Sequence, residues 1–334
     1  MKSFRFLPAA LVFAAPLCAF PPGDSQQNSQ EQAQAIRINV DRVNVGVIVT
    51  DASGHFVEGL HRGDFHVFDN RIEQPLTDFA AIEEPAQVLL LIEAGPAVYL
   101  LEGGHLQAAY ALLNGLSTGD RVAVVRYAEM PQAILDFTPD KQAAAAAFDQ
   151  LRFNLGFGSL NLSTSVLKVL EWLANVAGKK SIVLLSTGVD TFPSNESALV
   201  IQRLRASDVR LLAVSLTAGL RNPQPARKKK VPAANPTQTA QQFEQADQLL
   251  KRMAEATGGR AYFPVNAKEF NAVYAEIAQI VRHEYSLAFA PPAHDGLLHS
   301  IEVRVDAAQK PAANSPGSPY RVDHRQAYLA PAPR

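Results

Sequence analysis

Two long apolar runs, each followed by a glycine-containing loop, constrain the fold of this chain more than any other feature. The first run, Val88–Ile92, ends shortly before Gly95, and the second, Ser181–Leu185, ends shortly before Gly188. Continuous apolar runs of this length, bounded by turn residues, are typical of strands that are buried on both faces of a parallel sheet. In such sheets, ligands bind at the loops that follow the carboxyl ends of the strands. The sequence therefore predicts a parallel sheet whose functional face is formed by these loops.

Helical stretches alternate with further strand-like segments between residues 85 and 283. Besides the two apolar runs, the expected strands are Arg121–Tyr127, an edge hairpin around Ala133–Phe137, Arg210–Ser215 and Arg260–Phe263. The expected helices are His105–Leu116, Lys141–Leu151, Ser163–Val176, Asn195–Ser207, Gln241–Thr257 and Ala267–His283. This alternation predicts the α/β class, with a doubly wound, mostly parallel sheet that is covered by helices on both faces.

The two flanks of this α/β region have strand patterns instead. Residues 36–84 contain alternating apolar positions separated by turn residues, and residues 284–334 return to strand patterns. We predict that both ends of the chain build one small antiparallel β domain, in which the α/β domain of residues 85–283 is inserted. Insertions of this kind are tolerated where the ends of the inserted domain meet in space. The alternative is a pair of unrelated β extensions.

Residues 1–19 have the pattern of a secretory signal peptide. Lys2 and Arg5 precede an apolar core, Leu7–Cys18, and Ala19 supplies a small residue at the expected cleavage point. The apolar core is shorter than a membrane-spanning helix needs, which favours export over a membrane anchor. Acylation of Cys18, the only cysteine, is a lipoprotein alternative, which the bulky leucine before it disfavours. We therefore predict a secreted or periplasmic protein.

Composition limits the partners of the mature chain. The sequence has 334 residues, of which 47% are hydrophobic and 19% charged, and its formal net charge is -1. This length allows one substantial core and a smaller domain, after a polar leader at residues 20–35 that we expect to be flexible. The near-neutral charge gives no general attraction to nucleic acid. No later apolar stretch is long enough for an integral membrane segment.

Several short motifs, in a fixed order, resemble one group of secreted proteins. They are Val45–Asp51, Asp64–Asn70, Tyr285–Leu287, Asp295–Val305 and Tyr328–Pro331. Together they are similar to the von Willebrand factor A-related proteins of Acidobacteria, in which a segment like Asp64–Asn70 precedes an A domain. The resemblance covers nearly all of the mature chain and implies an A-type domain between the two β segments.

The same family binds a metal ion at a D-x-S-x-S motif after its first strand and at an aspartate in a later T/S-D-G loop. In this chain the three motif positions align with Ile92, Ala94 and Pro96, and the later aspartate aligns with Thr187. Ser159 lies near the position of a further hydroxyl ligand, with Ser163 and Thr164 as alternatives. Because the aligned side chains lack the carboxylates that Mg²⁺ sites favour, the resemblance implies a degenerate metal site.

Two alternatives for these loops stay open. Shifting the alignment by one residue places Glu93 at the first motif position but leaves Gly95 and Ala97 at the serine positions. Glu93 and Asp190 are the only carboxylates near the loops, so a rebuilt, weak cation site is the second alternative. We expect no metal and no cofactor.

Catalytic motifs are absent from the sequence. It contains no nucleophile elbow, no dinucleotide fingerprint, no phosphate-binding lysine loop and no zinc-protease spacing. We therefore expect a non-enzymatic module that binds an unidentified protein partner through the loop face. The residues expected on the binding rim are Glu93, Tyr99, Phe157, Asp190 and Phe192. The rival hypotheses are a structural component of the cell envelope and a divergent Mg²⁺-dependent adhesin.

Overall fold

A computed structural model describes residues 42–82, 84–95, 102–151, 158–191, 196–221, 236–306 and 320–333. The predicted signal peptide, the leader and the first residues of the N-terminal β segment lie outside the described residues. All described residues belong to one compact unit, 40–334. Within this part of the chain, no helix is both long enough and apolar enough to cross a membrane.

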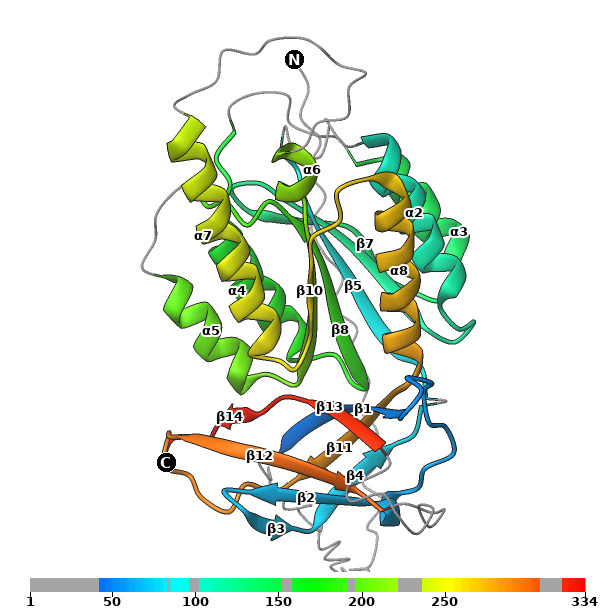
Figure 1. Ribbon diagram of the computed structural model, residues 1–334, viewed down its shortest axis with the longest axis vertical. Coiled ribbons are helices and arrows are strands. Elements are labelled where there is room, and N and C mark those ends of the chain that lie inside the picture. Colours follow the sequence, from blue (N-terminus) through cyan, green and yellow to red (C-terminus); the bar gives the residue numbers. More distant parts are fainter. Residues whose placement is uncertain are drawn as a thin grey trace, which may run out of the picture. The chain divides into compact units, whose positions relative to one another are not determined.

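A six-stranded sheet forms the centre of the α/β domain, with the strand order β10-β9-β8-β5-β6-β7 (Figure 1). Its strands are β5 (Ala86–Glu93), β6 (Arg121–Tyr127), β7 (Pro131–Thr138), β8 (Lys179–Ser186), β9 (Val209–Ser215) and β10 (Ala261–Tyr262). Five strands are parallel, and the edge strand β7 runs antiparallel to β6. The two apolar runs of the sequence are the neighbouring central strands β5 and β8, so the predicted parallel sheet with an edge hairpin is confirmed.

Helices cover both faces of this sheet, as Figure 1 shows. One face packs against α2 (Glu102–Gly115), α3 (Lys141–Asp149) and α8 (Ala267–Arg282), and the other against α4 (Leu162–Leu173), α5 (Glu196–Ala206) and α7 (Pro236–Glu255). Side chains alternate along a strand, so Leu90 faces the first helix layer and Leu91 the second. Full burial of each leucine stabilises the fold by about 1.5–3 kcal/mol. The doubly wound α/β class is confirmed.

Both ends of the described chain combine in two four-stranded antiparallel sheets. The first has the order β13-β1-β11-β4 and the second β14-β12-β2-β3. Their strands are β1 (Val43–Asp51), β2 (Phe65–Asp69), β3 (Ile72–Gln74), β4 (Leu76–Ala80), β11 (Glu284–Phe289), β12 (Leu298–Val305), β13 (Tyr320–His324) and β14 (Ala327–Leu329). The strand β1 pairs with β11 and β13, and β2 pairs with β12. The α/β domain is therefore inserted in a β domain made of both ends, and two unrelated extensions are excluded.

A separate apolar core fills the β domain. Buried side chains of both sheets form it, including Val45, Val67, Leu287 and Val303. The strand β12 alternates strictly between exposed and buried residues, which is the pattern of a strand with one face on a core and one on solvent. This alternation fixes the register of β12, because a slip by one residue would turn its apolar side chains outward.

Candidate functional site

The carboxyl ends of β5, β6 and β8 meet at one edge of the central sheet and form the loop face. Three strand-terminal residues come together there: Glu93 of β5, Tyr127 of β6 and Ser186 of β8. Glu93 and Tyr127 are register partners in the parallel pairing of β5 with β6. Thr187 follows β8 directly and joins the same cluster. The parallel register thus places one carboxyl group among three hydroxyl groups.

The Glu93 carboxyl group is the centre of this cluster. Its Oε2 accepts hydrogen bonds from the Thr187 backbone N–H (2.7 Å) and Oγ1 (2.9 Å), from Ser186 Oγ (3.2 Å) and from the Tyr127 hydroxyl (3.2 Å). The Glu93 side chain is 0% exposed. Burial raises the pKa of Glu93, and its hydrogen bonds oppose that rise only in part. Burial and the nearby Glu93 charge also hold the pKa of Tyr127 well above its ordinary value.

The second carboxyl oxygen of Glu93, Oε1, differs from Oε2 in its hydrogen bonding. Within the described part of the chain, Oε1 has no hydrogen-bond partner, although it is buried. A Cβ atom at Gly95 would lie 2.9 Å from Oε1, so a larger residue there would press on this oxygen. Burial of this unpartnered oxygen belongs to the desolvation that raises the pKa of Glu93, whereas the hydrogen bonds to Oε2 act in the opposite direction.

This geometry corrects one of the sequence predictions. Ile92 packs in the apolar core beside α2 and α8, and the side chain that meets Thr187 is Glu93. Ala94 is buried, with its N–H donating to the Tyr127 carbonyl. Glu93 was also expected on the exposed rim, but it lies fully buried beneath it, because its strand-end position points into the cluster. Thr187 is buried with its hydroxyl on Glu93.

Asp190 caps the N-terminus of α4. Its Oδ1 accepts from the Leu162 N–H (2.9 Å), and its Oδ2 accepts from the Ser163 N–H (3.3 Å) and Oγ (2.9 Å). Asn161 adds a cap by accepting from the Thr164 N–H (3.0 Å). Unpaired N–H groups and the helix dipole both favour a negative charge at this end. The half-buried Asp190 carboxylate is therefore engaged in holding α4.

Only one of the remaining five predicted site residues lies within the described part of the chain. Ser159 is half-buried in the segment that precedes α4. Pro96, Tyr99, Phe157 and Phe192 lie outside the described residues. Of the predicted residues, the structure thus brings together Glu93 and Thr187, and it places Asp190 at the neighbouring helix end.

Sequence reasoning missed two features of the loop face. Met130, in the turn between β6 and β7, is 55% exposed and is a large apolar side chain at this edge. Asp247 of α7 is buried, and its Oδ1 accepts from Ser215 Oγ (2.9 Å) and Thr217 Oγ1 (2.6 Å). Its Oδ2 pairs with Arg221 Nη2 at 2.7 Å. The position of Ser215 at a strand end was a usable signal, whereas nothing in the helical pattern distinguished Asp247.

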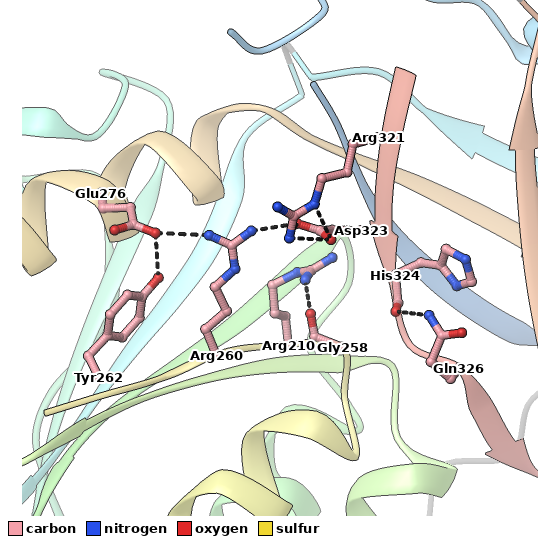
Figure 2. A network of polar contacts seen from close by, with 9 residues as sticks. All are labelled: Arg210, Gly258, Arg260, Tyr262, Glu276, Arg321, Asp323, His324 and Gln326. Atoms are coloured by element: carbon pink, nitrogen blue, oxygen red, sulfur yellow. Dashed lines mark hydrogen bonds and ion pairs between the residues drawn. The ribbon is translucent and has the colours of Figure 1, made fainter. Parts of the chain in front are cut away.

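A second polar cluster lies at the opposite ends of the strands, around a cavity of about 190 Å³. Figure 2 shows the Arg260 guanidinium between Glu276 and Asp323, with Arg321 on the same aspartate. Arg210 donates to the Gly258 carbonyl and pairs with Glu284 of β11 (Nε–Oε2, 3.0 Å). Each of these guanidinium groups is bound to a carboxylate. This cluster therefore joins β9 to β11, and Arg260, the residue before β10, to α8 and β13.

No protein-family model matches the chain, and no curated protein matches it. Among solved structures, it is similar to a von Willebrand factor type A protein from Catenulispora acidiphila, at 12% identity and a TM-score of 0.46, over 81% of this chain and 72% of that one. An aerotolerance-related membrane protein from Bacteroides fragilis is 14% identical, with a TM-score of 0.45, over 59% and 98%. BatB from Bacteroides thetaiotaomicron is 11% identical, with a TM-score of 0.43, over 59% and 99%.

Proposed function

We propose that this chain is an exported, non-enzymatic protein-binding module that engages its partner through the loop face without a bound metal ion. One observation carries the metal-independent part of the proposal. The strand-end carboxyl group, Glu93, is buried, and four possible donors of Tyr127, Ser186 and Thr187 lie within hydrogen-bond distance of its Oε2. A group so engaged is a poor ligand for Mg²⁺, which demands near-ideal octahedral geometry and usually keeps several waters.

The second carboxylate of the loop face supports the same proposal. Asp190 uses both oxygens on the first turn of α4, with contacts to Leu162 and Ser163. Turning Asp190 toward a cation would leave those helix N–H groups without their cap, which costs about 0.5–2 kcal/mol. Metal binding therefore competes with the local fold at both carboxylates.

Met130 supports the protein-binding part. The turn that carries it is tied down, because the Ala128 carbonyl accepts from the Asn161 N–H at 2.8 Å. A largely exposed methionine on a fixed turn is a suitable apolar anchor, since its flexible thioether side chain adapts to the surface of a partner. Because Met130 is 55% exposed, burying the rest of its side chain in an interface contributes about 1–1.5 kcal/mol, roughly half of the value for full burial.

Affinity capture from a cell-envelope extract tests this proposal, with the full chain as bait. The captured protein should be lost with the Met130→Asp variant and retained in EDTA. Ile72→Asp is the matched control, because Ile72 is 67% exposed on β3 of the β domain, away from the loop face. Capture that survives Met130→Asp but fails with Ile72→Asp would instead assign binding to the β domain. That result favours the structural-component hypothesis.

A second candidate, the Mg²⁺-dependent adhesin, is favoured by one observation. Glu93 Oε1 is buried and has no partner among the described residues, and the hydroxyl groups of Ser186 and Thr187 lie on the neighbouring oxygen. Under this hypothesis, capture requires Mg²⁺ and EDTA abolishes it. The same experiment therefore separates the two candidates.

A further inference from the structure

A histidine between two carboxylates lies in the β domain, outside the loop face. His299 of β12 is buried; its Nδ1 lies 2.8 Å from Asp69 Oδ1, and its Nε2 lies 3.1 Å from Asp295 Oδ2. Asp69, at 1% exposure, also accepts a hydrogen bond from the Tyr328 hydroxyl (2.7 Å). The cluster joins β2, the turn before β12, and β14.

Both contacts of His299 require that the imidazole carry two protons. Ionised carboxylates only accept hydrogen bonds, and a neutral imidazole has a single N–H to donate. The titratable groups that face the ring are Asp69, Asp295 and Tyr328, and Arg325 is the cation that acts on Tyr328. Burial alone would lower the pKa of His299, but hydrogen bonds to Asp295 and Asp69 outweigh it and raise the pKa above 6.5.

The turn that contains Asp295 depends on this arrangement. Asp295 Oδ1 accepts from the Leu297 N–H at 2.9 Å, so the carboxylate joins His299 to the turn. Two backbone bonds then attach the turn to the C-terminal residues, Gly296 N–H to the Pro331 carbonyl (3.0 Å) and Ala330 N–H to the Leu297 carbonyl (2.9 Å). Leu297 itself is exposed.

We propose that His299, Asp69 and Asp295 form a protonation-dependent clasp that fixes this turn against the C-terminal residues 330 and 331. Loss of one proton from His299 opens the clasp on the Asp295 side. Asp69 keeps the remaining N–H, because its Oδ1 is buried at 1% exposure and would otherwise lose its partner, while Tyr328 stays on Oδ2. The Asp295 side chain is 38% exposed and can turn to water instead.

The sign of the pH dependence follows from the raised pKa. The contribution of the clasp is fully present below the unfolded-chain value of 6.5 and is lost as the pH rises through the higher folded value. A rise in pH therefore loosens the turn and frees the exposed Leu297 to change its position. A fall in pH to 6 leaves the turn fixed.

Two measurements on the full chain test the clasp. The first is an NMR titration of ¹³C-labelled histidine rings between about pH 5.5 and 9, with His299→Gln to assign the resonance; the titration midpoint should lie above the reference value of about 6.5. The second is hydrogen exchange at the amides of Gly296 and Ala330. As His299 loses its proton, the protection of these amides should fall about tenfold for each unit by which the folded-state pKa of His299 exceeds 6.5.

Asp295→Asn and His66→Gln are the informative variants. An asparagine can donate to the neutral ring and still accept from Leu297, so the protection of the Gly296 amide should no longer change as His299 loses its proton. His66 also lies between two carboxylates but is more exposed, and its replacement should leave the His299 titration unchanged. A wild-type His299 midpoint at or below 6.5, or unchanged protection at Gly296 and Ala330 through the titration, overturns the proposal.

Discussion

Replacement of Glu93 by leucine or glutamine is the most direct test of the buried cluster at the loop face. Leucine removes the acceptor for the Thr187 N–H and Oγ1, while Tyr127 and Ser186 keep their mutual contact at 2.6 Å. A buried donor without a partner costs about 1–3 kcal/mol. Glu93→Leu leaves both Thr187 donors without an acceptor, although the hydroxyl group can rotate to another partner. We therefore expect this variant to be destabilised by about 2–4 kcal/mol.

Glutamine should be tolerated far better than leucine at the same position. It has the shape of a protonated glutamate and keeps an oxygen that accepts from Thr187, so we expect a change within about 1 kcal/mol. Because burial raises the pKa of Glu93, the wild type loses stability as the pH rises from the ordinary value of 4.5 through the folded value. Glu93→Gln should remove that dependence.

Urea denaturation of the wild type and both variants measures these differences in unfolding free energy. Tyr127→Phe serves as a control for the contribution of a single donor, expected at about 0.5–1.5 kcal/mol. If Glu93→Leu is as stable as the wild type, or if glutamine is as costly as leucine, the hydrogen-bonded carboxyl group does not hold the loop face together as described.

Three further substitutions probe other parts of the account. Asp190→Ala should lower the unfolding free energy in urea by about 0.5–2 kcal/mol, because α4 loses its cap. A decrease below about 0.5 kcal/mol, which is the spread seen at exposed sites, would contradict that role. Glu284→Leu should cost about 3–5 kcal/mol because it strands the buried Arg210, and Arg210→Met in the same chain should recover most of it. Gly46→Ala should also destabilise the fold in urea denaturation, because its Cβ would meet the Glu284 carboxylate, which Arg210 holds in place.

The fold could be predicted from the sequence because its signals are periodic and local. The runs at Val88–Ile92 and Ser181–Leu185 can only be buried on both faces, and the alternation along β12 can only belong to a half-buried strand. The pairing of both chain ends could be predicted because strand patterns flank the α/β region on both sides. These features survive an error of one residue in any boundary.

The site could not be predicted to the same depth, because a strand reverses the direction of its side chains at every residue. A shift of one position decided whether Ile92 or Glu93 faced the loop cluster, and apolar periodicity does not distinguish the two where both faces are buried. The cap made by Asp190 and the network of Asp247 join residues far apart in sequence. Such contacts follow from the packing of α4 and α7 and leave no local pattern.

We propose that the loop face binds its partner without a metal ion. Whether a cation binds there is measured by the melting temperature (Tm) of the full chain in millimolar Mg²⁺ and in EDTA. A cation at 100 times its dissociation constant would stabilise the folded state by about 2.7 kcal/mol, which corresponds to a rise in Tm of about 5 °C or more. We expect the same Tm with Mg²⁺ and with EDTA. A rise that EDTA reverses, and that Glu93→Ala or Asp190→Ala abolishes, would show that these carboxylates form a working cation site.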